Sequence, residues 1–274
     1  MPELPEVETV KRTLSELVVG KTISSVTVKW ANIIKEPDDT KQFEMLLLNQ
    51  TIREIRRRGK FLLFECDDVV MVSHLRMEGR YGLYKKDEEL TPHTHVIFHF
   101  TDGDELRYQD VRKFGTMHIF PKGSEEGGLP LAQLGMEPFS EQFTAEVLQA
   151  AFSKTNRKIK VALLDQKTVV GLGNIYVDEA LFRARIHPER LAQALSEEEL
   201  IVLHHAIVTT LQEAVDLGGS SIKSYVNGQG EMGLFQQKLD VYGRKNEPCR
   251  QCGTEIVKIV VGGRGTHYCP NCQI

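Results

Sequence analysis

Four cysteines near the C-terminus constrain the fold of this chain more than any other feature. They form two pairs, Cys249-x2-Cys252 and Cys269-x2-Cys272, with sixteen residues between the pairs. Each pair turns two thiolates towards one metal ion, and four thiolates complete a tetrahedron with no open position. The spacing therefore predicts a zinc-ribbon finger that holds one structural Zn²⁺. Two disulfides are the alternative, which an oxidising compartment would favour.

The segment between the two cysteine pairs predicts a β-hairpin. "EIVKIVV" and "THYC" are the expected strands, and "GGRG" is the turn between them. This hairpin would carry Arg264 outward on a rigid tip held by the metal. A guanidinium fixed in this way suits a phosphate group, although an exposed turn arginine can also be inert.

The composition is that of a globular protein with one large domain or two ordinary ones. The chain has 274 residues, of which 41% are hydrophobic and 26% are charged. It contains no run of eighteen apolar residues and begins with no charged-then-apolar signal segment. We therefore expect no membrane association and a cytoplasmic location. The fifth cysteine, Cys66, lies in an apolar run and is expected to be a buried thiol.

The hydrophobic pattern divides the chain into a strand-rich part and a helical part. Residues 5–18 have the spacing of an amphipathic helix, and short alternating runs over 22–120 predict an antiparallel β-sandwich. Pro, Gly and acidic residues make 121–142 an expected linker. Four helical segments follow, the last beginning at the capping box Ser196–Glu199. The long glycine-rich stretch 218–237 is expected to be a functional loop.

These patterns give an α+β fold of two domains with a zinc finger at the end. The predicted limits are 1–130 for the helix and sandwich, 131–237 for the helical domain, and 238–274 for the finger.

The charge distribution leaves two interpretations open. The net charge of −4 argues weakly against nucleic acid as a partner. However, the bases concentrate in 53–60, in 153–160 and in the C-terminal segment, while acids predominate elsewhere. A basic face on an acidic protein and scattered solvated charge are both compatible with this pattern.

Three further motifs suggest binding groups, each with an ordinary structural alternative. "GLGN" before a helix offers free backbone N–H groups to a phosphate, or Asn174 simply caps the helix. Lys60 enters an apolar strand and either extends to solvent or is placed for chemistry. Met77 and Phe114 lie at turns beside bases such as Arg112, which suggests a wedge between stacked bases, although core packing is the simpler explanation.

The N-terminus, "MPELPEVETV", allows two explanations. Proline at the first helical position and acids at the positive end of the helix dipole favour an ordinary helix start. Alternatively, removal of Met1 would give Pro2 a free secondary amine with the Glu3 carboxyl group beside it. An α-amine has a pKa of about 8, against about 10.4 for lysine, so it needs little change to act as a nucleophile near neutral pH.

Six segments together resemble one known family. "PELPEVETV", "RRGKFL", "SHLRMEGRY", "DVRKFGT", "GLGNIYVDEALF" and "GRGTHYCPNCQ" look like formamidopyrimidine-DNA glycosylase, a bifunctional base-excision repair enzyme of bacteria. The resemblance extends from end to end and occurs in the same order. It implies a sandwich domain, a helix–two-turn–helix module and a zinc finger with four cysteine ligands. The implied activity is excision of oxidised purines (8-oxoguanine, formamidopyrimidines) from duplex DNA through a proline Schiff base, followed by β- and δ-elimination.

The resemblance also implies roles for individual residues, with damaged double-stranded DNA as the partner of a monomer. The 218–237 loop would close over the extruded base. The implied catalytic residues are Pro2, Glu3, Glu6, Lys60 and Arg264. The implied DNA contacts are His74, Met77, His93, Arg112, Phe114, Lys154, Asn174, Tyr242, Lys258 and Arg264.

The chain departs from the family pattern at a few positions and leaves two rival functions. Arg185 stands where glycine is expected, Met136 stands where proline is expected, and "SIKSY" differs from the common pattern. One rival is the related endonuclease VIII, which removes oxidised pyrimidines. The other is a non-catalytic zinc-ribbon DNA-binding protein.

Overall fold

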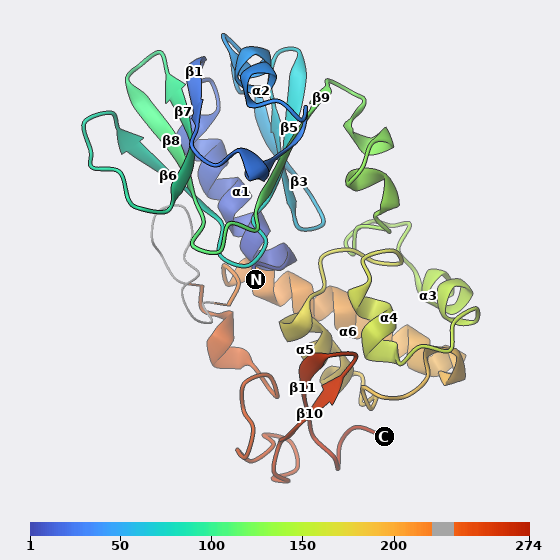
Figure 1. Cartoon of the computed structure of the whole chain (residues 1–274). Helices are drawn as coiled ribbons and strands as arrows, with labels where there is room; N and C mark the ends of the chain where they lie inside the picture. Colours follow the sequence, from blue (N-terminus) through green and yellow to red (C-terminus); the bar gives the residue numbers. More distant parts are fainter. Residues whose placement is uncertain (221–232) are drawn as a thin grey trace. The chain divides into compact units, whose positions relative to one another are not determined.

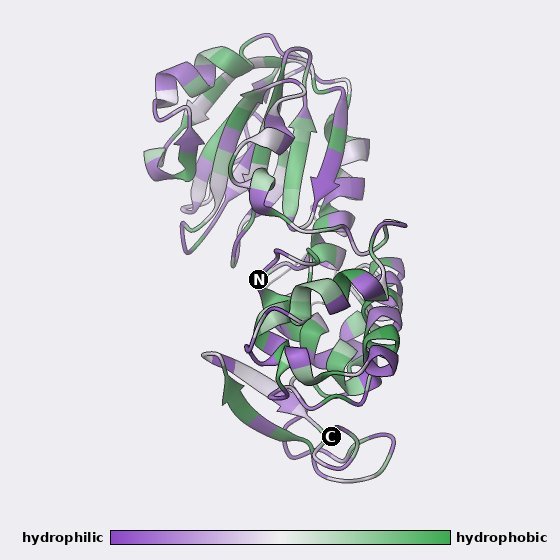
Figure 2. Cartoon of the chain, turned by 90° about the vertical axis from the view of Figure 1, so that its right-hand side faces the viewer, coloured by the Kyte–Doolittle hydropathy of each residue, from purple (hydrophilic) through white to green (hydrophobic). Residues whose placement is uncertain are grey.

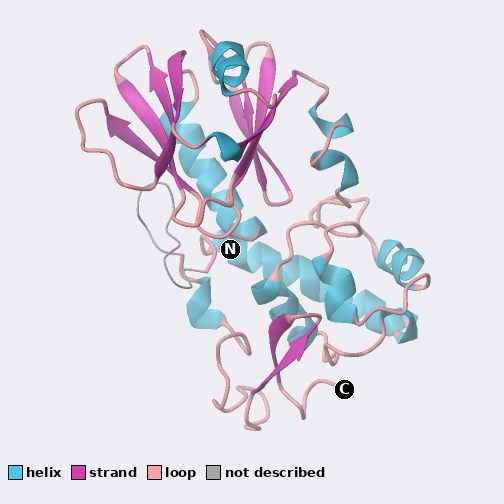
Figure 3. Ribbon diagram, in the orientation of Figure 1, coloured by secondary structure: helices cyan, strands magenta, loops and turns pink. Residues whose placement is uncertain are grey.

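The computed structural model describes residues 1–220 and 233–274. The chain forms two compact units. The first contains Met1–Pro2 and Glu6–Gln133, and the second contains Glu3–Pro5, Leu134–Ser220 and Leu234–Ile274. Strands dominate the first unit and helices the second (Figure 3).

The first unit contains two β-sheets. One has four strands in the order β1-β7-β8-β6, and the other has five in the order β2-β9-β5-β4-β3 (Figure 1). Neighbouring strands are antiparallel except β2 and β9, which run parallel. The strands are β1 (Ile23–Val28), β2 (Ile34–Glu36), β3 (Glu54–Arg58), β4 (Phe61–Glu65), β5 (Val69–His74), β6 (Arg80–Lys85), β7 (Thr94–Phe100), β8 (Asp104–Gln109) and β9 (Thr116–Pro121).

One hydrophobic core joins both sheets to the N-terminal helix. Helix α1 (Leu4–Val18) contributes Val7, Val10, Leu14 and Val18 to it, at the three- and four-residue spacing of one helix face. A second helix, α2 (Thr40–Leu47), begins at Asp39, whose carboxylate accepts the backbone N–H groups of Lys41 and Gln42. The short 3-10 helices of this unit are η1 (Ala31–Ile33), η2 (Glu125–Gly127) and η3 (Leu131–Gln133).

The predicted helix and sandwich are therefore confirmed, with one additional helix and three additional strands. The helix α2 lies in a region where only strands are expected. It was not predicted because its two buried residues are too few to give a clear helical period. The strands β2, β3 and β6 also lie outside the alternating runs of the sequence, since β2 has only three residues, β3 carries three arginines and β6 is only partly buried. The segment "TDGD", whose Asp-Gly pair is typical of hairpin turns, connects β7 to β8, with Gly103 in the left-handed region at φ 89°.

The second unit contains the four predicted helices. Helix α6 has the expected capping box, in which the Ser196 hydroxyl accepts the Glu199 N–H and the Glu199 carboxylate accepts the Ser196 N–H. The helices are α3 (Ala145–Phe152), α4 (Ile159–Leu164), α5 (Asn174–Arg183) and α6 (Glu197–Asp216), with the 3-10 helices η4 (Ala192–Ala194) and η5 (Phe235–Lys238).

The cysteine segment forms the predicted hairpin within this second unit. Strands β10 (Val257–Val261) and β11 (Arg264–Tyr268) pair antiparallel around Gly262 and Gly263, with φ of 55° and 75°. Two successive positive φ values are typical of the tight turns that connect such strands. β10 is largely hydrophobic and β11 is not (Figure 2).

Two of the three departures from the family pattern lie in the described residues, and both have structural explanations. Arg185 follows α5 with φ 59°, and the N–H of Ile186 donates to the Leu181 carbonyl, which is the left-handed helix end that normally takes glycine. The Met136 N–H donates to the Thr168 carbonyl at 3.0 Å, a bond that the expected proline could not make.

The predicted 218–237 loop lies partly outside the described residues. Gly218 and Gly219 follow α6 with positive φ values of 74° and 80°, which is typical of glycines at a helix end. Residues 221–232, including most of "SIKSY", are not described. Among the helices of the described ranges, none combines the length and apolar character needed to cross a bilayer.

Candidate functional site

The carboxylate of Glu3 occupies the N-terminus of α5. Its two oxygens accept backbone N–H groups from Gly173 at 2.7 Å, Ile175 at 2.9 Å and Tyr176 at 3.3 Å. The residue is 2% exposed. A carboxylate at this position is favoured both by the unpaired N–H groups of the first helical turn and by the helix dipole.

The glycines before α5 provide room for this arrangement. A Cβ atom at Gly173 would lie 2.3 Å from the Glu3 carboxyl carbon, and one at Gly171 would lie 2.5 Å from Leu4 Cδ1. The Leu4 N–H also donates to the Gly171 carbonyl at 3.1 Å. The interpretation of "GLGN" as a phosphate cradle is therefore wrong in one respect, because these N–H groups already bind a carboxylate of the chain itself.

Asn174 is the first residue of α5, and the N-cap is Gly173. The amide Nδ2 of Asn174 donates to the Gly265 carbonyl at 2.8 Å, which connects α5 to β11. Its Oδ1 is buried and accepts no hydrogen bond from the described part of the chain. Burial raises the pKa of the Tyr242 hydroxyl, while Asn174 acts on that pKa in the opposite direction. The sequence alternative in which Asn174 caps the helix is wrong.

A buried ion pair fixes β11 on α4 and α5. Lys160 Nζ donates to Asp178 Oδ1 at 2.6 Å, with both side chains fully buried, and to the Gly265 carbonyl at 3.3 Å. The other oxygen of Asp178 accepts the backbone N–H of His267 at 2.8 Å. Burial lowers the pKa of Lys160, although Asp178 and Glu3 both oppose that change.

A second buried acid, Glu179, holds the segment that leads into the zinc ribbon. Its carboxylate accepts the backbone N–H groups of Asp240, Val241 and Tyr242 at 2.8, 3.0 and 2.9 Å. Burial raises the pKa of Glu179 to about 7, against these three donors. Glu179 thereby positions Tyr242, whose ring contacts that of His267 at 5.0 Å between centroids.

The four terminal cysteines fit one zinc ion. Their sulfur atoms all lie within 4.8 Å of one another, with Cys249–Cys272 at 3.9 Å and Cys252–Cys269 at 3.5 Å. A tetrahedron with Zn–S bonds of about 2.3 Å requires sulfur atoms about 3.8 Å apart. None of the four is in a disulfide. The predicted structural Zn²⁺ is confirmed as the ion that this set would hold, and all four positions are taken by protein.

The exposed cations of the second unit lie on the hairpin and beside α3. Arg264 opens β11 directly after the two turn glycines rather than within the turn, and its side chain is exposed. Lys258 lies on β10 and Lys154 follows α3, both exposed. Within residues 1–220 and 233–274, no carboxylate pairs with any of these three groups, so they are available to an anion.

In the first unit, the expected catalytic residues are buried. Pro2 and Glu6 lie at the start of the chain, and Glu6 is 2% exposed on α1. Lys60 follows Gly59 in the two-residue turn between β3 and β4, so it precedes the apolar strand rather than lying in it. Its side chain is buried, and its positive charge contributes to a lower pKa at His74.

His74 is a buried histidine at the end of β5. Burial lowers its pKa to about 3, and the charges of Arg76 and Lys60 act in the same direction. Its Nδ1 accepts the N–H of Arg76 at 2.9 Å, and its ring contacts Phe61 edge-on. The neutral ring therefore shapes the turn that carries Met77.

The three expected wedge residues lie on two exposed turns. Met77 is 37% exposed and Phe114 is 52% exposed, so the core-packing alternative is wrong for both. The Arg112 guanidinium lies 4.8 Å from the centre of the Phe114 ring. His93 is exposed, and its carbonyl accepts the N–H of Asp110, which begins the second turn.

The basic stretch 53–60 is not a free cationic face. Arg53 pairs with Asp67 and Arg57 with Glu8, at 2.6 and 3.0 Å. Arg56 pairs with Glu65 and Glu125 at 2.9 and 2.6 Å. These three arginines are therefore neutralised by carboxylates of the first unit, so they form neither the basic face nor the scattered solvated charge that the sequence allowed.

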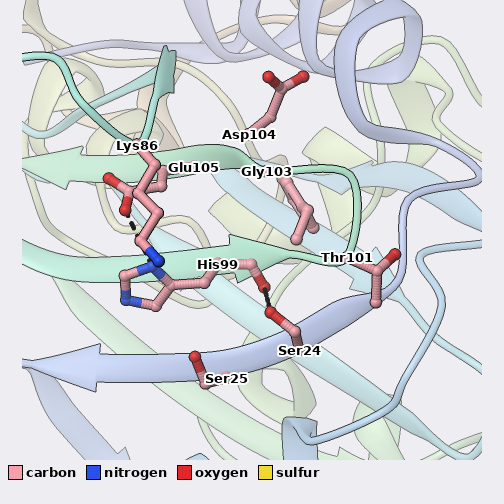
Figure 4. A pocket seen from close by; sticks show the side chains of 9 residues that line it. Ser24, Ser25, Lys86, His99, Thr101, Gly103, Asp104 and Glu105 are labelled. Atoms are coloured by element: carbon pink, nitrogen blue, oxygen red, sulfur yellow. Dashed lines mark hydrogen bonds and ion pairs between the residues drawn. The ribbon is translucent and has the colours of Figure 1, made fainter.

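A pocket on the four-stranded sheet has no part in this site. It has a volume of about 560 Å³, and several of its polar groups are already paired (Figure 4). The His99 ring bonds Glu105 and Thr27, each at 2.9 Å, and Asp104 pairs with lysines. We assign no function to it.

The buried charged residues Lys160, Asp178 and Glu179 were not predicted from the sequence. A signal was present, because "NIYVDEALF" places two adjacent acids in a helix whose other residues are almost all apolar. Two adjacent acids buried in such a helix require partners. Their partners lie in α4 and in the cysteine segment, which no local pattern identifies.

Known proteins resemble this chain along its whole length. Three family models match: the formamidopyrimidine-DNA glycosylase N-terminal domain over residues 1–117, the H2TH domain of that enzyme over 134–226, and the zinc finger found in FPG and IleRS over 246–274. The formamidopyrimidine-DNA glycosylase of Cytobacillus firmus is 83% identical over 274 residues, covering 100% of both chains. That of Bacillus subtilis (strain 168) is 62% identical, covering 100% of this chain and 99% of the relative.

Solved structures of Fpg also resemble this chain over nearly its full length. The crystal structure of the wild-type Lactococcus lactis Fpg (MutM) with DNA containing N7-benzyl-Fapy-dG matches with a TM-score of 0.93 and 44% identity, covering 99% of each chain. The complex of Lactococcus lactis Fpg with DNA containing an abasic site matches with a TM-score of 0.93 and 43% identity, again covering 99% of each chain. On this evidence, the chain belongs to the formamidopyrimidine-DNA glycosylase family.

Proposed function

We propose that this protein excises oxidised purines, such as 8-oxoguanine and formamidopyrimidines, from double-stranded DNA and then cleaves the strand at the abasic site. The observation that carries the proposal is the fixed start of the chain. Glu3 is bound by three N–H groups of α5, and Leu4 by the Gly171 carbonyl. Pro2 is therefore one residue away from an anchored point, which suits a group that must meet a sugar carbon in one geometry.

The nucleophile in this proposal is the nitrogen of Pro2. The nitrogen is an amide while Met1 is attached, so the proposal requires removal of Met1. The free secondary amine attacks C1′ of the damaged nucleotide, the bond to the base breaks, and the sugar opens as a cationic iminium forms. That cation draws electrons from C2′, whose proton is lost as the 3′-phosphate leaves, and a second elimination releases the 5′-phosphate.

Glu3 is the proposed proton carrier for Pro2. Its carboxylate directly follows Pro2 in the chain and is fixed in place by backbone N–H groups of Gly173 and Ile175. It can therefore take the proton that the Pro2 nitrogen loses during attack and return a proton to the opening sugar. Glu6, also buried on α1, is proposed as a supporting carboxylate that stabilises the positive charge on the Pro2 nitrogen.

Lys60 and Arg264 are the proposed phosphate-binding groups of the elimination steps. Arg264 is exposed on a hairpin that the zinc site holds at one end and the Lys160–Asp178 pair at the other. When bound, zinc supplies rigidity here and no chemistry. His74, His93, Lys154, Asn174, Tyr242 and Lys258 remain proposed DNA contacts.

Met77, Arg112 and Phe114 are proposed to fill the space of the extruded base. Two exposed turns carry an aliphatic side chain, a cation and an aromatic ring, which are the groups that unstack bases and replace them. The 218–237 loop is proposed to close over the extruded base.

The proposed context is a monomer acting on DNA in the bacterial cytoplasm. The proposed domain limits are 1–130, 131–237 and 238–274. The family models leave 118–133 and 227–245 between them unmatched, and these segments contain or adjoin the proposed limits.

A substrate comparison tests the function. Duplexes with 8-oxoguanine and duplexes with thymine glycol are incubated with protein from which Met1 is shown to be absent. We expect excision and strand cleavage at 8-oxoguanine to be much faster. Preference for thymine glycol would assign an activity like that of endonuclease VIII, and binding without cleavage would assign a non-catalytic DNA-binding protein.

A further inference from the structure

The two turns that carry the proposed wedge are crossovers between the two sheets of the first unit. Residues 75–79 lead from β5 in one sheet to β6 in the other, and residues 110–115 lead from β8 back to β9. The registers His74–Thr116 and Arg80–Gln109 pair the strand ends on both sides. The two crossovers therefore run side by side, although they are far apart in the sequence.

The hydroxyl of Tyr108 lies between these two crossovers. A Cβ atom at Gly115 would lie 1.7 Å from it, and one at Gly79 would lie 2.2 Å from it. Both turns therefore approach the hydroxyl so closely that only glycine fits at these two positions. The side chain is fully buried, and its ring contacts Tyr81 at 5.1 Å between centroids. Its position fixes the spacing between the backbones at Gly79 and Gly115.

Asp110 connects that hydroxyl to the turn of Arg112 and Phe114. Its Oδ2 accepts the Gly115 N–H at 2.8 Å and the Tyr108 hydroxyl at 3.3 Å, and its Oδ1 accepts the Arg112 N–H at 3.0 Å. Asp110 is 1% exposed. The Asp110 carboxylate thus fixes the backbone at Arg112 and at Gly115, the two ends of the exposed turn. Between them, Lys113 is in the left-handed region at φ 59°.

We propose that Tyr108 and Asp110 are positioning residues that hold the Met77 turn and the Arg112–Phe114 turn at the one spacing that lets both enter the DNA together. This inference rests on the proposed function. It concerns neither the nucleophile nor phosphate binding. It predicts a defect in opening the base stack that leaves the covalent chemistry intact.

The test uses Tyr108→Phe, which removes one oxygen, and Asp110→Asn, which leaves one of its two N–H donors facing an amide NH₂. Tyr81→Phe is the matched control, because Tyr81 is also a buried tyrosine whose hydroxyl bonds that of Ser73 at 2.7 Å, but it is not among the nearest neighbours of either turn glycine. Urea unfolding identifies any variant that does not fold, and the other variant then carries the test.

Each protein is assayed in single turnover on 8-oxoguanine paired with cytosine and on 8-oxoguanine in a single-nucleotide bulge. Opening of the stack costs least when the base is already unpaired. For both variants we expect a roughly tenfold to hundredfold loss on the paired lesion, the scale of a small misplacement. On the bulged lesion, and in borohydride trapping on abasic DNA, the loss should be smaller by roughly tenfold. Tyr81→Phe should behave as wild type.

Equal losses on paired and bulged lesions, or no loss in either variant, would overturn the positioning role. Failure of the wild-type protein to excise or to be trapped would instead overturn the proposed function itself. The two failures are therefore distinguishable in one experiment.

Discussion

Glu3 combines a structural and a chemical role in one side chain. Its carboxylate satisfies three N–H groups at the N-terminus of α5, and it follows directly after the proposed nucleophile. Its substitution should therefore affect both folding and catalysis, and the two effects can be measured separately.

For Glu3→Gln we expect a loss of about 1–3 kcal/mol in the free energy of unfolding, because an amide NH₂ must then face a backbone N–H. Excision of 8-oxoguanine should fall by roughly two to four decades, the usual contribution of one acid–base group. Cleavage of abasic DNA should fall less, since the base is already absent. Glu16→Gln, exposed on α1, is the control. Equal losses on the two substrates would show that Glu3 serves the later steps as much as base release.

His74 should contribute to unfolding in acid. Its folded pKa is lowered from 6.5 to about 3, so the unfolded chain binds the extra proton and stability falls as the pH falls from 6.5 towards 3. His74→Gln removes this proton while keeping an acceptor for Arg76. The free energy of unfolding of the wild type should fall more steeply than that of the variant, by up to about 1.4 kcal/mol per pH unit. Parallel pH profiles from urea unfolding would contradict the assignment of a neutral buried ring.

The sequence indicated which individual residues are important, but it did not indicate which groups those residues contact. The N-terminal motif indicated Glu3, but its partners lie at 173–176 and belong to a helix that was expected to hold a phosphate. Arg185 illustrates the reverse case. The expected glycine was absent, and the structure shows the left-handed backbone that makes glycine the usual residue there.

At the scale of elements, helix α5 organises the second unit. Its N-terminus binds Glu3, Asn174 and Asp178 hold β11, and Glu179 holds the segment before the zinc ribbon. Periodicity predicted α5 and the hairpin separately. It could not predict their connection, because buried polar contacts between distant segments leave no local pattern.

Each residue of the Lys160–Asp178 pair should stabilise the fold only while its partner is present. Asp178→Asn leaves a buried lysine without a counter-charge, and we expect a loss of about 3–5 kcal/mol in the free energy of unfolding. The double variant Lys160→Met, Asp178→Asn should recover much of that loss, since no charge is then buried. Urea unfolding of both single variants and the double variant gives the coupling energy. Additive losses would show that the two charges do not stabilise each other.

At the scale of the whole molecule, the net charge is a poor guide to the partner. The arginines at 53–57 are neutralised by carboxylates, whereas Lys154, Lys258 and Arg264 have no carboxylate partner among the described residues. Fold class and family could be predicted from the sequence, but this division of charge depends on tertiary pairing.

Affinity for lesion duplex should fall steeply with salt despite the net charge of −4, because the unpaired cations displace counterions from phosphates. Arg264→Ala should reduce the slope of the log–log plot by about one. Arg56→Ala, which removes an arginine paired with Glu65 and Glu125, should leave the slope unchanged. A flat plot for the wild type, or equal slopes for the wild type and Arg264→Ala, would contradict this division of the charged surface.

Borohydride trapping tests the central claim, that Pro2 forms a covalent iminium with the sugar, most directly. The protein is first shown by mass to lack Met1, then incubated with 8-oxoguanine duplex and sodium borohydride, and the cross-linked peptide is sequenced. We expect a stable protein–DNA adduct that maps to Pro2, and a much weaker adduct for Pro2→Gly, whose primary amine sits on a looser chain. No adduct from the protein without Met1, or an adduct that maps to Lys60, would contradict the claim.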